Sequence, residues 1–129
     1  REFSQGIFRN AKDELVVLPA TEVKTTREFF DFEAKYVPGL TEEITPADLT
    51  QEQQERAARI IKEIYIRLNC QGMVRVDFFL ENETDKFFFI EINTIPGQTA
   101  QSFIPQQVRA FGMKESDFYA ELIEAALVK

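Results

Sequence analysis

Two apolar segments in the second half of the chain, residues 73–80 and 87–93, alternate in a way that is typical of β-strands. Successive side chains of a strand point to opposite faces, so each segment has one wholly apolar face. These apolar faces carry Val74, Val76, Phe78 and Leu80 in the first segment, and Phe88, Ile90 and Ile92 in the second. The opposite faces carry Arg75, Asp77 and Phe79, then Phe87, Phe89, Glu91 and Asn93. The polar turn at 82–85 predicts a hairpin.

The first half of the chain is also strand-like. Residues 2–9 and 14–18 are predicted to form a hairpin around a turn-prone segment at 10–13, and the strand pattern continues over 21–24. Residues 40–50, LTEEITPADLT, show no periodicity and are expected to form a long loop.

A helix is predicted to begin at Thr50, because Thr50 and Gln53 form a capping-box pattern. The apolar positions expected on its buried face are Ala57, Ile60, Ile61, Ile64 and Leu68. The helix should end near 69–72. A short helix is expected over 103–111 with Gly112 as its stop, and an amphipathic helix over 115–128. Strands come first and are followed by a helix, a hairpin and two helices, so we expect an α+β domain with a mainly antiparallel sheet and flanking helices.

Composition and charge limit the number of domains and the classes of binding partner. The 129 residues, 44% of them apolar and thirteen of them Phe, are enough for one domain with a sizeable core. The net charge of −7 and the lack of a basic segment count against nucleic acid or an anionic membrane as the main partner. Electrostatics therefore favour a small ligand, a metal ion or another protein.

Residue types exclude further classes. With a single cysteine, Cys70, the chain cannot form an intramolecular disulfide, and with no His it cannot build a His-based zinc site or a Ser/His nucleophilic pair. No apolar run approaches the length of a membrane-spanning helix. We expect a soluble protein of the cytoplasm. The opening REFSQGIF has no initiator Met and looks like the inside of a strand, so we also expect a piece of a longer protein.

If both apolar strand faces look into one core, Arg75, Asp77, Glu91 and Asn93 lie together on the other side of the hairpin. The turn length suggests Asp77 near Glu91 and Arg75 near Asn93. Two carboxylates that face each other repel, so a positive group should lie between them. That group is either Arg75, in a solvated charge network, or a hard cation such as Mg²⁺ with oxygen ligands. Three Phe on the same face (79, 87 and 89) favour a ligand site, unless they pack under the loop or against a missing part of the protein.

Several motifs together resemble the C-terminal part of D-alanine-D-alanine ligases, which are ATP-grasp enzymes. They are REF at the start, FFDFEAKYV at 29–37, EEITPA at 42–47, GMVRVDFFL at 72–80 and FFIEINTIPGQTAQSFIP at 88–105. The resemblance covers essentially the whole chain, with the motifs in the family's order and spacing. It implies ATP-dependent joining of two D-alanines for bacterial peptidoglycan, through an acyl phosphate that the amine of the second D-alanine attacks.

The resemblance also implies roles for individual residues. Asp77, Glu91 and Asn93 would be ligands of two Mg²⁺ ions, for which Mn²⁺ can substitute, with Glu91 also in the ATP site. Arg75 would neutralise charge on the transferred phosphate and the tetrahedral intermediate. Gly97 would offer a backbone N–H, and Ser102, at the start of the 103–111 helix, would hold the carboxylate of the second D-alanine.

Five further residues are implied in binding. Glu2 would bind the ATP ribose, and Phe29 and Phe79 would contact adenine. Lys35 and Tyr36 would belong to a loop that closes over the site, with Lys35 reaching phosphate or substrate carboxylate and Tyr36 shaping the second-substrate pocket. Without the resemblance, Glu2 and Lys35 are surface charges, and Phe residues are more often core.

The resemblance implies that residues 1–129 are a C-terminal ATP-grasp subdomain whose N-terminal and central subdomains are absent, so that the chain alone should be inactive. It allows a homodimer of the full-length enzyme. Three alternatives stay open: a D-alanine-D-lactate ligase, another ATP-grasp carboxylate-amine ligase, and a non-catalytic binding module whose acidic face is merely solvated. Tyr36 favours the dipeptide ligase over ester-forming relatives.

Overall fold

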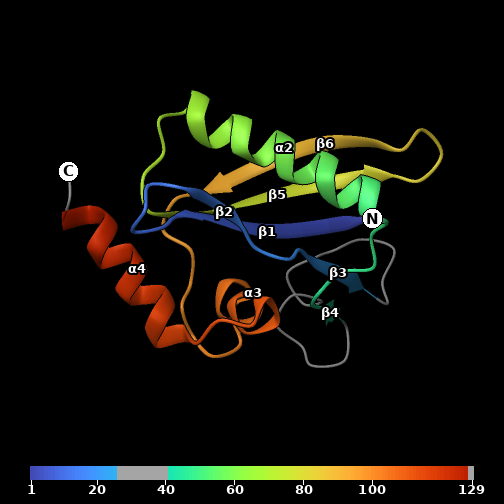
Figure 1. Cartoon of the computed structure of the whole chain (residues 1–129). Helices are drawn as coiled ribbons and strands as arrows, with labels where there is room; N and C mark the ends of the chain where they lie inside the picture. Colours follow the sequence, from blue (N-terminus) through green and yellow to red (C-terminus); the bar gives the residue numbers. More distant parts are fainter. Residues whose placement is uncertain (26–40, 128–129) are drawn as a thin grey trace.

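The computed structural model describes residues 1–25 and 41–127, and its central feature is a six-stranded antiparallel sheet (Figure 1). The strands are β1 (Glu2–Arg9), β2 (Leu15–Val17), β3 (Thr21–Thr25), β4 (Thr41–Ile44), β5 (Met73–Glu81) and β6 (Lys86–Asn93). They lie in the order β4-β3-β1-β5-β6, and β2 pairs with the last residues of β1. All of these pairings are antiparallel, which confirms the predicted fold class and the hairpin of β1 and β2.

Helices cover both faces of this sheet. Helix α2 (Gln51–Arg67) lies across one face, whereas α3 (Phe103–Phe111) and α4 (Glu115–Leu127) lie on the other (Figure 1). The predicted bounds of α3 are confirmed, and its stop residue Gly112 adopts a left-handed conformation with φ of 90°, which glycine reaches without strain. Within the described part of the chain, no helix is both long and apolar enough to cross a membrane.

The start of α2 follows the predicted capping box. The Thr50 hydroxyl accepts a hydrogen bond from the Gln53 N–H at 3.1 Å, and the Gln53 side chain accepts one from the Thr50 N–H at 3.0 Å. The predicted buried face is only partly correct: Ala57 and Ile61 are buried, but Ile60 and Leu68 are exposed. The sheet contacts a narrower stripe of the helix than the apolar pattern suggests.

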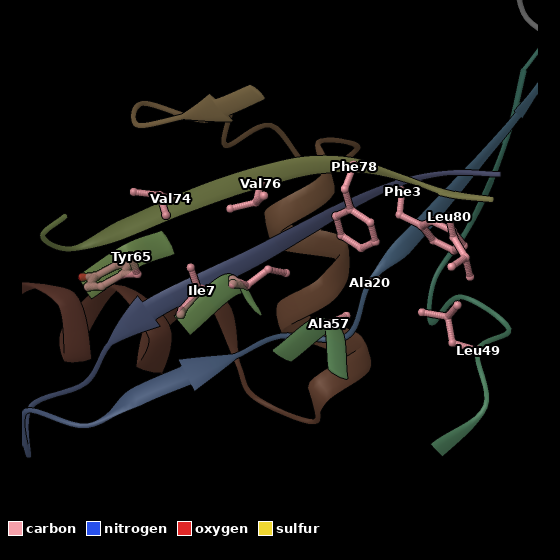
Figure 2. Packing of buried hydrophobic residues seen from close by; sticks show 11 residues of the cluster. Phe3, Ile7, Ala20, Leu49, Ala57, Tyr65, Val74, Val76, Phe78 and Leu80 are labelled. Atoms are coloured by element: carbon pink, nitrogen blue, oxygen red, sulfur yellow. The ribbon is translucent and has the colours of Figure 1, made fainter. Parts of the chain in front are cut away.

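The main core lies between α2 and the sheet, and Figure 2 shows its side chains pointing toward one another. Phe3 of β1 stacks on Phe78 of β5 with ring centroids 5.4 Å apart. Tyr65 of α2 is fully buried here, and its hydroxyl donates to the Gly72 carbonyl at 2.8 Å, which satisfies the one polar atom of the ring. A second core joins Phe8 of β1 to α3 and α4.

The prediction of a loop throughout 40–50 is wrong in part, because β4 lies within it. Thr41–Ile44 pairs with β3, opposite residues 22–25. The segment is a short edge strand with two exposed glutamates at its centre, so it lacks the apolar alternation by which strands are recognised.

Candidate functional site

A β-bulge in β6 builds the polar face of the hairpin. Glu81 pairs with Lys86 and Phe78 with Phe89, but beyond the bulge Asp77 pairs with Glu91, which leaves Ile90 unpaired. Without the extra residue, Glu91 would lie opposite Val76 and would face the core under α2. The bulge therefore turns Glu91 to the side of the sheet that carries Asp77.

The bulge also corrects the predicted faces of β6. Phe87 and Phe89 were expected beside the charges, but they lie on the α2 side, where Phe87 packs edge-on against Phe78 at 5.4 Å. Phe88 and Ile90 were expected in the core, but both are exposed. Only Ile92 packs against the core as predicted. The reason is that one inserted residue reverses the alternation on one side of it.

The register aligns three rows of residues on the polar face, each taking one residue from β1, β5 and β6. The rows are Glu2 with Phe79 and Phe88, Ser4 with Asp77 and Glu91, and Gly6 with Arg75 and Asn93. The predicted neighbours, Asp77 with Glu91 and Arg75 with Asn93, are confirmed as directly paired positions.

Asp77 is held by two side chains. The Arg75 guanidinium donates to both of its carboxylate oxygens, at 3.0 and 3.1 Å, and the Ser4 hydroxyl donates to Oδ1 at 2.6 Å. The Arg75 and Asp77 side chains are 18% and 14% exposed, so water screens this pair less than a surface ion pair. Arg75 is therefore one positive group beside the facing carboxylates.

Helix α3 brings an aromatic ring to the same place. The Arg75 guanidinium carbon lies 5.2 Å from the centroid of the Phe103 ring, at the first residue of α3. A guanidinium over an aromatic face is attracted by the ring quadrupole. Arg75 is thus fixed between Asp77 and Phe103, with its charge near the start of the helix.

These side chains line a cleft of about 250 Å³. Its walls come from β1, β3, β4, β5, β6 and α3, and its acidic members outnumber Arg75. They are Glu2, Glu43, Asp77 and Glu91. The cleft therefore presents oxygen ligands and one guanidinium, a combination suited to a cation bound together with an anion such as phosphate.

Asp77, Glu91 and Asn93 fit a hard divalent cation by donor chemistry, since they supply two carboxylates and an amide oxygen from paired positions. The Asn93 oxygen accepts the Ile95 N–H at 3.0 Å and retains a second lone pair. Among the described residues, no group of three or more His, Cys, Asp or Glu side chains could hold a metal ion. Such a cation would therefore complete its shell with substrate oxygens or water.

Gly97 and Ser102 meet in the turn that leads into α3. A Cβ atom on Gly97 would lie 3.0 Å from the Ser102 Oγ, so a side chain there would crowd the hydroxyl. Ser102 is the N-cap residue of α3, and its Oγ accepts the Thr99 N–H at 3.1 Å rather than an N–H of the helix. The N–H groups of the first turn of α3 are thus not capped by this side chain.

The remaining predicted site residues fall in two groups. Glu2 lines the cleft, and Phe79 is paired beside it and 46% exposed on the same face of the sheet. Phe29, Lys35 and Tyr36 lie outside the described residues. Ser4 and Phe103 were not predicted to belong to the site, although period-two alternation from Glu2 places Ser4 on the polar face.

Two other features do not form candidate sites. A hollow of about 130 Å³ between α2 and β6 is lined only by apolar side chains, including Ile60, Ile64 and Phe89. Burial raises the pKa of the Cys70 thiol, which disfavours the reactive thiolate.

Comparison with known proteins gives a consistent match. A family model described as D-ala D-ala ligase C-terminus matches residues 1–124. A D-alanine-D-alanine ligase of Bacteroides fragilis is 45% identical over 123 residues, which are 95% of this chain and 37% of that protein. One from Leptospira interrogans is 38% identical, over 98% of this chain and 36% of the relative. The chain thus spans little more than a third of the curated relatives it matches.

Solved structures agree with this match. The VanG D-Ala:D-Ser ligase of Enterococcus faecalis superposes with a TM-score of 0.81 at 31% identity, over 96% of this chain and 35% of that one. A Bacillus anthracis D-alanine-D-alanine ligase complexed with ATP gives a TM-score of 0.77 at 30% identity, over 98% and 39% of the two chains.

Proposed function

Because the chain belongs to the D-alanine-D-alanine ligase family and matches the model of its C-terminus, we propose that residues 1–129 are the C-terminal ATP-grasp subdomain of a dipeptide ligase. The observation that carries the proposal is the Arg75–Asp77 pair, which faces Glu91 across the hairpin inside a cleft. In this role the cleft forms one wall of the site where ATP phosphorylates the first D-alanine and the second D-alanine displaces the phosphate.

Asp77, Glu91 and Asn93 would hold Mg²⁺ at the ATP phosphates. In this role these side chains would hold the two ions of the family, which would supply positive charge against the phosphates. The chain prepares this site in two ways: the bulge turns Glu91 toward Asp77, and the Ser4 hydroxyl holds Asp77 at 2.6 Å. Both carboxylates are therefore oriented by the sheet before any ligand binds.

Arg75 would stabilise negative charge on the transferred phosphate and on the tetrahedral intermediate. A guanidinium presents a planar set of N–H donors that matches the oxygens of a phosphate or carboxylate. Asp77 and the Phe103 ring hold it from two sides, so little side-chain freedom would be lost when an anion arrives.

Ser102 and the first turn of α3 would bind the carboxylate of the second D-alanine. Helix N-termini attract anions because their first N–H groups point outward. Gly97 keeps the space beside the Ser102 hydroxyl open, since any Cβ there would come within 3.0 Å of it. The same glycine would offer its backbone N–H to the substrate.

Nucleotide contacts would come from the row at the other end of the cleft. Glu2 would bind the ribose, and the exposed Phe79 beside it would contact adenine. We propose that Phe29 also contacts adenine, and that Lys35 and Tyr36 belong to a loop that closes over the site.

Because the chain spans about 37% of its relatives, the rest of the nucleotide and first-substrate sites would come from other subdomains, and the chain alone would be inactive. In this role the full-length enzyme would act in cell-wall synthesis in the cytoplasm. A homodimer of the full-length enzyme is compatible with this role.

A chimera tests this proposal. This chain would replace the segment that it matches in the Bacteroides fragilis ligase, with which it is 45% identical. We expect release of ADP and phosphate that requires both D-alanine and Mg²⁺, with D-alanyl-D-alanine as product. A folded chimera without D-alanine-dependent turnover would favour the non-catalytic module.

The names of the relatives differ in the second substrate. The structural relative VanG is named as a D-Ala:D-Ser ligase, so D-serine and D-lactate should be offered as competing acceptors. We expect the chimera to prefer D-alanine. Preference for D-serine, D-lactate or an L-amino acid would overturn the assignment of D-alanyl-D-alanine as product but keep the ligase class.

A further inference from the structure

A buried glutamine of α3, Gln107, fills a gap in the sheet. β1 pairs with β3 through residues 2–4 and with β2 through residues 7–9, so residues 5 and 6 have no strand partner on that side. The Gln107 side chain is 0% exposed and enters this gap. Its oxygen accepts the Gly6 N–H at 2.8 Å, and its nitrogen donates to the Ser4 carbonyl and to the Thr21 hydroxyl, both at 3.0 Å.

The close approach of α3 depends on a missing side chain in β1. A Cβ atom on Gly6 would lie 2.5 Å from Ile104 Cδ1 and 3.1 Å from the Gln107 oxygen. The helix is therefore in direct contact with the strand backbone, and the Gln107 hydrogen bonds determine where along β1 it lies.

The attachment joins β1 to α3, and each of these elements carries a residue at the candidate site. Ser4, whose carbonyl Gln107 holds, donates its hydroxyl to Asp77. On the helix, Gln107 lies four residues after Phe103, so both lie on the same face of α3. Its position therefore determines how Phe103 and Ser102 lie relative to Arg75.

We propose that Gln107 is a positioning residue, which places the N-terminus of α3 at the correct distance from Arg75 and Asp77 for the second substrate. This inference rests on the proposed ligase function. β1 is itself held by β5 over residues 2–8, so we expect loss of the attachment to shift the helix rather than the sheet. Groups on α3 that contact the acceptor substrate should be affected more than groups on β5 and β6 that contact ATP.

The kinetic test uses Gln107→Met in the active chimera, which keeps the side-chain length and removes the hydrogen bonds. Since displacing a positioning group by about 1 Å costs up to ~100-fold, we expect the KM for D-alanine to rise about tenfold or more. The KM for ATP should stay within about twofold, because α3 does not contact the nucleotide in the proposed site. Gln107→Glu keeps an acceptor for the Gly6 N–H but sets a buried carboxylate against the Ser4 carbonyl, so it should raise this KM as well.

The neighbouring Gln106 provides a matched control. Its side chain donates to Glu43 at the cleft and to the Gln101 carbonyl but not to β1, so Gln106→Met should raise the KM for D-alanine far less than Gln107→Met does. In the full chain, amide exchange of Gly6 should accelerate in Gln107→Met and not in Gln106→Met, which reports the attachment without any turnover.

The outcomes separate this inference from the proposed function. A wild-type chimera without turnover would overturn the ligase proposal, and the positioning role with it. An active wild-type chimera with an unchanged KM for D-alanine in Gln107→Met would overturn only the positioning role. Equal changes in both KM values, or in both glutamine variants, would also overturn it, because they would indicate a general loss of structure. If Gln107→Met does not fold, the same comparison is made with Gln107→Leu, which also removes the hydrogen bonds without burying a charge.

Discussion

The two faces of the central sheet are built from the same strands, but one packs in the main core and the other lines the cleft. On the α2 side, β1 and β5 contribute Phe3, Val76 and Phe78, which are buried in the main core. On the other side, the alternate positions carry Ser4, Arg75 and Asp77 beside a cleft. The first face excludes water and stabilises the fold, whereas the second keeps its charges paired and oriented.

Because of this difference, residues that stabilise the fold alternate along one strand with residues that line the proposed site. Neighbours in sequence, such as Asp77 and Phe78, face opposite sides and so should respond differently to substitution. Changes on the α2 side should lower the free energy of unfolding, and changes on the cleft side should alter binding and turnover.

Replacement of Phe78 by Ala should give the largest loss of stability. Phe78 is 5% exposed and contacts the rings of Phe3 and Phe87 at 5.4 Å each, so truncation leaves a large cavity. Such substitutions cost about 3–5 kcal/mol. Denaturant unfolding of the chain measures this, with Phe79→Ala on the exposed face as the matched control. Equal losses in the two variants would contradict the division between the faces.

A charged residue on the α2 side, Glu22, should make the free energy of unfolding depend on pH. Glu22 is buried opposite Phe3, and the Arg1 guanidinium donates to both of its oxygens, which lowers the pKa of Glu22 below its ordinary value of 4.5. A lowered pKa means that the ion pair contributes fully above about pH 4.5 and that its contribution is lost as the pH falls through the folded-state value. We expect unfolding free energy to decrease below pH 4.5, and this part of the decrease to disappear in Glu22→Gln.

Thr50→Ala should have a smaller effect that is confined to α2. The variant loses the hydroxyl that accepts the Gln53 N–H, which typically costs about 1 kcal/mol. Thr50→Ser keeps a hydroxyl and should restore most of the loss. Since Thr50 lies away from the cleft, the KM values of the chimera should not change; a shift in them would show that α2 also influences the site.

The same comparison shows how far sequence reasoning reaches. The faces of β5 could be predicted because apolar residues occupy every second position without interruption. These residues are Val74, Val76, Phe78 and Leu80. In β6, the run Phe87–Ile90 is apolar on both faces, so no pattern marked the bulge at Ile90 that reverses the alternation. The α2 capping box and the Gly112 stop could be predicted because both depend on local hydrogen bonding and backbone conformation.

Long-range contacts could not be predicted. The hydrogen bonds between Gln107 and β1 join residues about a hundred positions apart, and a glutamine in an amphipathic helix usually faces water. The Phe103 ring beside Arg75 likewise depends on where α3 lies against the sheet. Asp77 and Glu91 were expected together because both apolar strand faces were assigned to one core; they do lie together, but the bulge at Ile90 is what turns Glu91 to the side of Asp77.

Glu91→Gln tests the central claim most directly, because it changes one carboxylate on the exposed face and little else. We expect the unfolding free energy of the chain to stay within about 0.5 kcal/mol of the unchanged protein, as is usual for surface substitutions. In the chimera, the same substitution should abolish D-alanine-dependent release of phosphate from ATP. Undiminished turnover would contradict the proposed metal-binding role of Glu91, and with it the assignment of the cleft as the Mg²⁺ and ATP site.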